Sequence, residues 1–501
     1  MKERKQQIYK TAWYLAVFGI LYLWFARVKP LVPYDGDDWL YLSYARKAVP
    51  LWGDWNPARV LPEVLMPLCG AVAAYVVMPL TGDYIGSITI VSAVVVSGFL
   101  TAYVYFFETL VAKKFSLPAF GVRLLGGLFM LSHFLVFRGE DRGNTHLLHC
   151  LDLTCYFYYL IPAALNCVLV MFLATGGCER LSGEKELGKK ALFVALVYFA
   201  VFSNLPDSVI LAVYAGVQVL LSFAKEIRGK IDWKKFLKEN NIYWLILILW
   251  VISAVFELFG ARAQDEMGYR LSFLQSLKET IYRLVMGIKG WNKAFFLFAA
   301  VTVASAGAVL VLTKKKGEGE KKFLAEAGEV LLCTVIMALA AVVLCAKVDI
   351  TYISRAEYLF GVYFYGFLLV LMCLAYLLEK QPKILLVLPI VACILLSETH
   401  TAGGTYLDPN FLGVDAAICK AIDEDMIDQI VTASEAGQKE MVLHAPASDR
   451  SSNWPIAYYV GERIANTLFE HGVLDAPIQV TVEPDPEMNR KYGLGVPDAY
   501  E

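Results

Sequence analysis

The chain has 501 residues, of which 58% are hydrophobic and only 18% are charged, and its formal net charge is −2. This near-neutral balance excludes the strongly basic surface by which a protein holds nucleic acid. The high apolar fraction, arranged in runs that approach about 20 residues, predicts an α-helical protein that crosses a membrane several times.

Apolar runs of near-spanning length recur along most of the chain, and they predict about eleven transmembrane helices. The expected spans are residues 11–29, 86–110, 121–137, 156–175, 191–203, 209–224, 242–258, 293–312, 326–346, 359–378 and 384–397. A basic N-terminus precedes the first run and no small-residue cleavage site follows it. This pattern indicates an uncleaved anchor rather than a signal peptide.

Lysine and arginine gather in every second connection between these runs, from Lys113 and Lys114 to Lys380 and Lys383. Because basic loops remain on the cytoplasmic side, we expect a plasma-membrane protein with a cytoplasmic N-terminus and an extracytoplasmic C-terminus. Residues 59–80 are apolar enough to cross, but a crossing there would invert every later loop. We therefore interpret this stretch as an interfacial or re-entrant segment on the outer face. The alternative, a true span, would require another of the expected spans to be wrong.

The first outer loop, residues 30–85, contains the sequence Tyr-Asp-Gly-Asp-Asp-Trp-Leu-Tyr at 34–41. Carboxylates beside a bilayer are costly to place, so Asp35, Asp37 and Asp38 are candidates for a functional site. A carboxylate can deprotonate a hydroxyl group or hold a divalent cation, and Asp37 with Asp38 would be the metal ligands. The competing interpretation is a solvated turn, because aspartate and glycine favour turns.

The same loop continues with alternating tryptophans, cations and carboxylates, among them Trp55, Arg59 and Glu63. Arginine pairs with phosphate through a bidentate fork. Tryptophan offers a flat face to a sugar ring, although its preference for the membrane interface makes anchoring the stronger expectation for Trp55. We take these three residues as candidate substrate contacts.

Two further outer loops carry polar residues where they meet the spans. The second loop, 138–155, contains Arg138, Arg142 and His146, which are candidates for contacts with a phosphate group. For His146 the alternative is an interfacial polar residue, and its spacing of three from His149 is only a weak signal of a metal site. Arg355 stands at the mouth of the tenth span, where it either anchors the span at the interface or holds a lipid phosphate. The inner loops are simple and rich in lysine, so the chemistry is expected at the outer face.

Residues 398–501 differ in composition from the transmembrane domain at 1–397 and predict a small extracytoplasmic α/β domain. Helical periodicity over 414–436 is followed by a strand that begins at Met441. A second helix and a second strand, beginning at Ile478, complete the alternation.

This arrangement resembles the GT-C class of integral membrane glycosyltransferases. Members have many spans, an acidic motif just after the first span and interfacial helices in the same loop, and some carry a soluble C-terminal domain. Here Asp37-Asp38 stands in the place of the acidic motif, and residues 59–80 stand in the place of the interfacial helices. The Asp-Asp-Trp pattern, followed by Trp-x-x-Ala-Arg at 55–59, is also similar to bacterial multi-pass families of poorly defined function and to the glucosyltransferases that decorate O-antigen.

The resemblance implies an inverting transfer of a sugar from a polyprenyl-phosphate-linked donor to a glycan or lipid acceptor of the cell envelope. In that scheme Asp37 is the leading candidate base and Asp38 assists it or binds a metal, while the additional Asp35 leaves open which carboxylate is catalytic. The candidates for the donor phosphate are Arg59, Arg138, Arg142 and Arg355. Metal dependence varies within the class, so a divalent cation, Mg²⁺ or Mn²⁺, is left open as a cofactor.

Two other function classes stay open at this point. A transporter or flippase of a lipid-linked intermediate would also need arginines at the outer face, but it should show a polar path to the inner face. A non-catalytic envelope scaffold should tolerate the loss of Asp37. The sequence contains no Walker loop, no dinucleotide-binding glycine motif and no hydrolase nucleophile motif, which excludes a nucleotide-driven pump.

Overall fold

The computed structural model describes most of the chain. The described residues are 2–33, 35–49, 55–137, 147–148, 150, 152–227, 232–259, 272–313, 317–399, 414–448, 452–453, 456–457 and 460–500. Among them, eight helices are long and apolar enough to cross a membrane, and a pair bent by 75°, Trp233–Glu239 with Asn241–Glu257, makes a ninth candidate. The chain is therefore a multi-pass helical protein, as its hydropathy pattern predicts.

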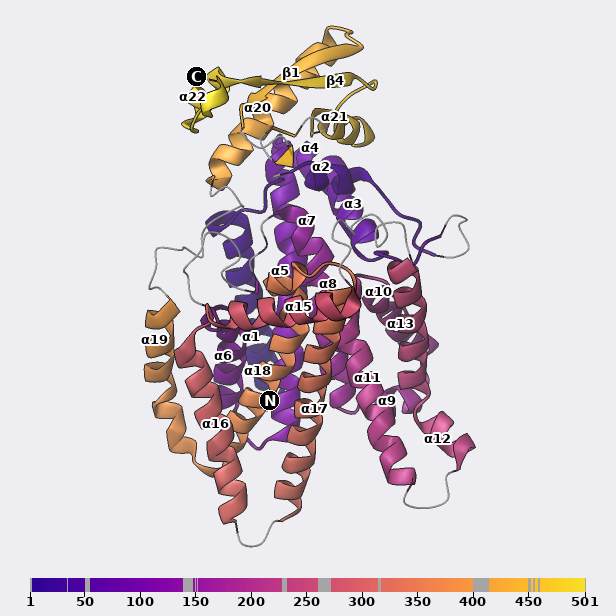
Figure 1. Ribbon diagram of the computed structural model, residues 1–501, viewed down its shortest axis with the longest axis vertical. Coiled ribbons are helices and arrows are strands. Elements are labelled where there is room, and N and C mark those ends of the chain that lie inside the picture. Colours follow the sequence, from indigo (N-terminus) through magenta and orange to yellow (C-terminus); the bar gives the residue numbers. More distant parts are fainter. Residues whose placement is uncertain are drawn as a thin grey trace.

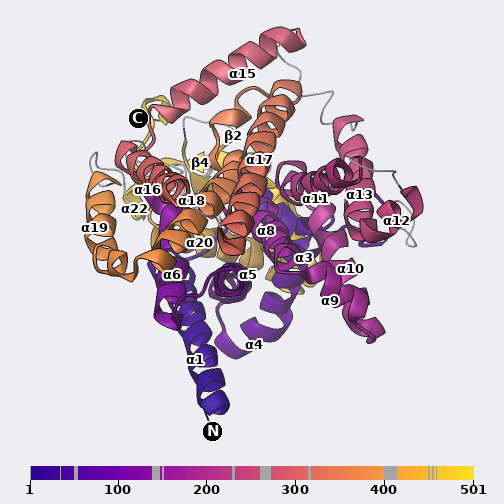
Figure 2. The same cartoon turned by 90° about the horizontal axis from the view of Figure 1, so that it is seen from below.

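Most of these helices run along the long axis of the molecule (Figure 1). The first half of the chain forms α1 (Lys2–Leu23), η1 (Trp24–Val28), α2 (Gly36–Ser43), α3 (Pro62–Val72), η2 (Ala73–Val77), α4 (Met78–Thr81), α5 (Tyr84–Lys114), α6 (Ala119–Leu135), α7 (Leu153–Cys155), η3 (Tyr156–Leu160), α8 (Ile161–Ala174), α9 (Gly177–Gly183), α10 (Leu187–Val201) and α11 (Leu205–Glu226). The second half continues with α12 (Trp233–Glu239), α13 (Asn241–Phe259), α15 (Phe273–Ile288), α16 (Lys293–Leu312), α17 (Glu318–Lys347), η4 (Tyr352–Ser354), η5 (Ala356–Leu359), α18 (Phe360–Lys380), η6 (Pro382–Leu386) and α19 (Leu388–Thr399). α15 lies across the direction of α5, since Figure 2 shows α15 from the side and α5 end-on.

Helices occur at all eleven predicted spans, but three of them are short. α6, α10 and α19 have 17, 15 and 12 residues, whereas a straight crossing takes about 20 residues. The described part of the chain therefore supports eight spans, or nine with the bent pair, rather than eleven by length and composition. One of the eight is Pro62–Thr81, which coincides with most of the stretch, 59–80, that we expect to lie at the interface.

That stretch forms α3, η2 and α4, which pack against α2 and α5. It also contacts the C-terminal part of the chain, because the Tyr75 hydroxyl donates to the backbone oxygen of Glu470 at 2.7 Å. Gly82 ends α4 with a left-handed φ of 69°, a conformation that glycine adopts without a Cβ clash. Figure 1 places these helices beside α21 at one end of the bundle. The interfacial position of residues 59–80 stays a prediction.

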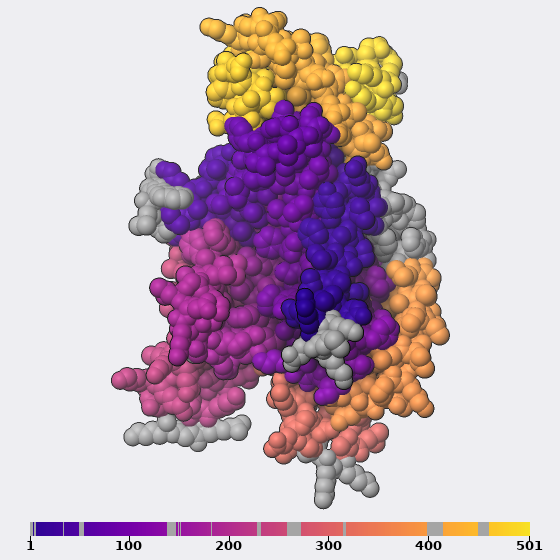
Figure 3. All heavy atoms as spheres, turned by 180° about the vertical axis from the view of Figure 1, so that it is seen from behind, coloured from indigo at the N-terminus to yellow at the C-terminus, as the bar shows by residue number. Residues whose placement is uncertain are grey.

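An α/β layer lies at the same end of the bundle. Its elements are α20 (Ala416–Glu435), β1 (Glu440–Pro446), β2 (Ser452–Asn453), β3 (Ile456–Ala457), α21 (Val460–Glu470), β4 (Gln479–Asp485), α22 (Pro486–Tyr492) and η7 (Asp498–Tyr500). β1 and β4 pair in parallel, from Glu440 with Gln479 to Pro446 with Asp485, while β2 and β3 form a separate antiparallel pair. The predicted alternation of helices and strands is thus present. In the space-filling view these residues rest on the N-terminal part of the chain (Figure 3).

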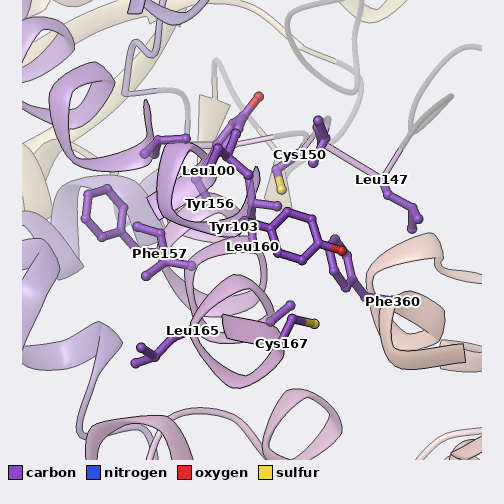
Figure 4. Close-up of a cluster of buried hydrophobic side chains, with 14 of the residues drawn as sticks. Leu100, Tyr103, Leu147, Cys150, Tyr156, Phe157, Leu160, Leu165, Cys167 and Phe360 are labelled. Carbon is purple, nitrogen blue, oxygen red and sulfur yellow. The ribbon is translucent and has the colours of Figure 1, made fainter. Parts of the chain in front are cut away.

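A buried hydrophobic cluster supports the part of the bundle beneath this layer. Its members come from α5, from η3 and α8, from the start of α18, and from Leu147 and Cys150 before α7. Figure 4 labels Leu100, Tyr103, Tyr156, Phe157, Leu160, Leu165, Cys167 and Phe360 among them. η3 is a single wide turn of π-helix within the span that α7 begins and α8 continues, and such turns occur often at functional sites. Tyr156 and Phe157 are fully buried, so packing holds this turn, and with it the neighbouring residues, in a fixed position.

Candidate active site

The acidic sequence after the first helix begins α2, and Asp35 caps that helix. Its Oδ1 accepts hydrogen bonds from the backbone N–H groups of Asp37 at 2.7 Å and Asp38 at 3.2 Å. In return, Oδ2 of Asp38 accepts from the Asp35 N–H at 3.4 Å, which completes a capping box. Carboxylates at this end also interact favourably with the helix dipole. Asp35 is therefore occupied with the start of its own helix.

Asp38 caps a second helix, α7, from the side. It is fully buried, and its Oδ1 accepts from the backbone N–H and the hydroxyl of Thr154, each at 2.6 Å. Its Oδ2 accepts from the N–H of Leu153 at 3.2 Å. These bonds satisfy N–H groups at the first turn of a long span, which would otherwise lack partners. Asp38 thereby joins the first turn of α2 to the segment of α7, η3 and α8.

Asp37 lies between these two residues in sequence but has a different environment. Its side chain is 58% exposed, and its Oδ1 pairs with Nη1 of Arg463 on α21 at 2.7 Å. Asp37 lines a cavity of about 250 Å³, whereas Asp35 and Asp38 do not. Of the three carboxylates in the motif, Asp37 is the one whose side chain is accessible from this cavity.

The cavity lies at the end of the bundle that carries the α/β layer, and it is lined by three kinds of residue. The charged and amide side chains are Asp37, Arg59, Asp152, Asn204, Glu257 and Arg355. The tyrosines are Tyr41, Tyr158, Tyr159, Tyr352 and Tyr358. The apolar lining comes from the start of α11 and the end of α17, with Leu205, Pro206, Leu344 and Val348. The site therefore combines a polar face with an apolar wall built from the ends of two spans.

Arg355 forms one side of the cavity within a group of aromatic rings. Its guanidinium carbon lies 5.3 Å from the ring centre of Tyr159, 5.7 Å from that of Tyr352 and 5.5 Å from that of Tyr358. Its Nε donates to Oε1 of Glu357 at 2.7 Å. Although burial alone would lower it, the pKa of Arg355 is raised by Glu357 and the neighbouring tyrosines. The guanidinium is thus held as a cation at the edge of the cavity.

Arg59 lies on another side of the cavity with a similar set of neighbours. Its Nε is 3.9 Å from Oε1 of Glu257, and its guanidinium carbon is 6.0 Å from the ring centre of Tyr158. Its φ of 57° is left-handed, which is uncommon for a residue with a side chain and costs of order 1–3 kcal/mol. Such strain gathers at functional sites, so the backbone at Arg59 is a second reason to regard this cavity as the site.

Several carboxylates crowd the start of α2. Burial raises the pKa of Asp35, and the charges of Asp152 and Asp37 raise it further. Burial likewise raises the pKa of Asp38, with Asp35 and Asp152 adding to the effect. Burial also raises the pKa of Asp152, which caps α7 through the N–H of Cys155 at 2.7 Å. Arginine side chains beside this group, those of Arg355 and Arg463, supply the opposite charge.

Not all of the predicted substrate contacts line the cavity. The indole N–H of Trp55 donates to the Tyr198 hydroxyl at 2.9 Å, and the ring packs on Phe202. Glu63 is buried and forms an ion pair with Arg46. Both side chains thus stabilise the loop between α2 and α3, and neither lines the cavity. Asp37, Arg59 and Arg355 do line it. Arg138, Arg142 and His146 lie outside the described residues.

Several other residues that line the cavity or lie beside it were not among the predicted substrate contacts. The five tyrosines come from α2, η3, η4 and η5, and the only local signal was the clustering of tyrosine at the start of two spans. Arg463 gives no local signal, because it is 426 positions from Asp37. Among the described residues, no group of three or more histidine, cysteine, aspartate or glutamate side chains is arranged to hold a metal ion. Asp37 and Asp38 take different partners, Arg463 for Asp37 and Leu153 with Thr154 for Asp38, and their role as metal ligands stays a prediction.

Comparisons with family models, with curated proteins and with solved structures find no match to this chain.

Proposed function

We propose that the protein is a membrane glycosyltransferase that moves a sugar from a polyprenyl-phosphate-linked donor to a cell-envelope acceptor at the outer face. The observation that carries the proposal is that Asp37, Arg59 and Arg355, from three distant segments, line a single cavity. A base and two cations around an apolar-walled cavity suit a reaction between a hydroxyl group and a lipid-linked phosphate ester. The resemblance to the GT-C class supports the same assignment.

The proposed reaction assigns each of these side chains a role. Asp37 takes the proton of the acceptor hydroxyl, and the acceptor oxygen forms a bond to the anomeric carbon of the donor sugar. The bond from that carbon to the phosphate oxygen breaks on the opposite face, so the configuration inverts. The phosphate leaves with the electron pair of this bond, and Arg355 and Arg59 stabilise its charge. The proposed reaction uses no step through a metal.

The environment of each group suits its role. Among the described residues, Oδ2 of Asp37 accepts no hydrogen bond, so this oxygen is available to an acceptor hydroxyl. Glu357 and three tyrosine rings hold the Arg355 guanidinium in place, which lowers the cost of ordering it around a phosphate. The apolar residues at the ends of α11 and α17 suit the first isoprene units of a lipid that enters from the bilayer.

The proposal is tested with purified protein in proteoliposomes and a panel of tritium-labelled undecaprenyl-phosphate hexoses. A wild-type chain that transfers one of these sugars to envelope lipid or glycan acceptors, with inversion at the anomeric carbon, supports the assignment. Asp37→Asn should abolish this transfer, whereas Asp428→Asn should not, because Asp428 lies on α20 outside the cavity. Equal transfer by both variants would refute the role of Asp37 and favour a carrier or scaffold function.

A further inference from the structure

One helix of the α/β layer, α21, lies with one face on α2, the helix that begins at the acidic sequence. Arg463, Thr467 and His471 follow each other at intervals of four residues. Residues with this spacing lie on one side of a helix. Each of the three contacts α2: Arg463 at Asp37, Thr467 at the backbone of Trp39, and His471, just beyond the end of α21, at the backbone of Leu42.

Thr467 and His471 hold the two helices together through buried hydrogen bonds. The Thr467 hydroxyl donates to the backbone oxygen of Trp39 at 2.6 Å and lies 2.8 Å from the Ser43 hydroxyl. Nε2 of His471 donates to the backbone oxygen of Leu42 at 3.2 Å, so Nδ1 accepts from the Tyr84 hydroxyl at 2.6 Å. Because both side chains are buried, these bonds fix the position of α21 along the axis of α2.

The fit at this contact is close. A Cβ atom at Gly70 of α3 would lie 2.3 Å from the backbone oxygen of Leu42 and 3.0 Å from Cε1 of His471. Only a residue without a side chain lets α3, α2 and the His471 ring approach so closely. The position of α21, and with it the position of Arg463, thus depends on contacts with three separate elements.

The consequence of this docking appears at Asp37. The Arg463 guanidinium meets Oδ1 of Asp37, on a side chain that is 58% exposed. Asp35 and Asp152 lie close enough for their charges to interact with Asp37. Without a cation beside it, an exposed carboxylate among like charges would turn toward solvent. The guanidinium instead holds one oxygen of Asp37 in a charge-assisted hydrogen bond.

We propose that Arg463 is a positioning residue of the active site, and that the C-terminal α/β layer completes the site through it. Arg463 binds Oδ1 of Asp37 and thereby directs Oδ2 into the cavity, toward the acceptor hydroxyl. This inference rests on the proposed function, because it takes Asp37 as the base. It adds that a residue from the C-terminal part of the chain sets the rate of proton transfer without touching the lipid-linked donor.

The test measures kcat and donor KM for full-length variants with the undecaprenyl-phosphate hexose that the wild type uses. Arg463→Ala should lower kcat by roughly tenfold to a hundredfold, because a misplaced catalytic group costs rates of this order, while donor KM stays within about twofold. Added methylguanidinium should restore part of the lost kcat, and Arg463→Lys should retain more activity than Arg463→Ala. Arg490→Ala, which removes an exposed arginine of α22, is the matched control and should behave as wild type.

Two further variants separate positioning from simple loss of docking. Thr467→Val and Gly70→Ala should loosen α21 and lower kcat, but methylguanidinium should not restore either of them, since Arg463 is still present. If Arg463→Ala keeps the wild-type kcat while Asp37→Asn is inactive, the proposed function stands and this inference is wrong. If Asp37→Asn is also fully active, both the proposed function and this inference are wrong.

The contact itself is tested without any substrate. The melting temperatures Tm of Asp37→Asn, Arg463→Ala and the double variant form a cycle in which interacting residues give non-additive changes. Strictly additive changes, or a methylguanidinium effect that is equal in Arg463→Ala and Thr467→Val, would overturn the inference.

Discussion

Replacing Asp38 by alanine should destabilise the protein far more than the same change at Asp37, although the two residues are adjacent. The Asp38 side chain is fully buried and accepts hydrogen bonds from the N–H groups of Leu153 and Thr154 and from the Thr154 hydroxyl. Asp37 is exposed, and among the described residues its one ion pair is with Arg463. Asp38→Ala therefore removes at least these three buried hydrogen bonds, whereas Asp37→Ala removes an exposed pair.

The expected free energies follow from these contacts. A buried donor left without an acceptor costs about 1–3 kcal/mol, so Asp38→Ala should lower the free energy of unfolding by roughly 3 kcal/mol or more. Loss of the helix cap in Asp35→Ala should cost about 1 kcal/mol. An exposed ion pair contributes about 0.2–1 kcal/mol, which sets the upper limit for Asp37→Ala.

The assay is thermal unfolding of the three purified variants in one detergent, with transfer measured at a temperature where all are folded. We expect the lowest Tm for Asp38→Ala, an intermediate value for Asp35→Ala and a nearly unchanged value for Asp37→Ala. The order of transfer rates should differ, with the deepest loss at Asp37. A Tm for Asp37→Ala as low as that of Asp38→Ala would refute the division of roles.

Two other predictions concern pH and the donor. Burial lowers the pKa of His471 to about 4 from 6.5, so the folded state takes up a proton less readily than the unfolded chain; the contribution of His471 to stability should be constant above about pH 6.5 and fall as the pH drops toward 4, and a plot of Tm against pH that matches His471→Gln would contradict this. Arg355→Ala should raise the apparent donor KM about tenfold or more, since a hydrogen bond to a charged group contributes about 1.5–3 kcal/mol; an unchanged KM would make Arg355 an interface anchor.

Much of the fold could be predicted from local patterns, because a membrane-spanning helix is recognised by the length and the hydropathy of its sequence. Each predicted span contains a helix, and the alternation of α20, β1, α21 and β4 follows the predicted periodicity. The number of spans could be predicted less well than the positions of the helices. Short helices such as α6 and α10 resemble long ones in composition, and Pro62–Thr81 meets the same criteria as a span while packing on α2.

The candidate site could be predicted only in part, for a tertiary reason. The position of the acidic motif was evident, but the separate roles of Asp35 and Asp38 depend on which N–H groups approach each carboxylate. Asp38 meets residues 115 and 116 positions away, and no spacing rule reveals that contact. Trp55 and Glu63 are residue types typical of a sugar site. Their contacts with Tyr198 and Arg46 instead stabilise the loop between α2 and α3.

The most direct measurement for the central claim is single-turnover sugar transfer by Asp37→Asn, with donor binding determined separately on the same preparation. A positioned base contributes about 10²–10⁴-fold, so the account predicts a transfer rate at least about a hundredfold below wild type, with donor affinity unchanged and Asp428→Asn fully active. Transfer by Asp37→Asn at the wild-type rate would contradict the account, because the cavity would then contain no catalytic carboxylate at this position.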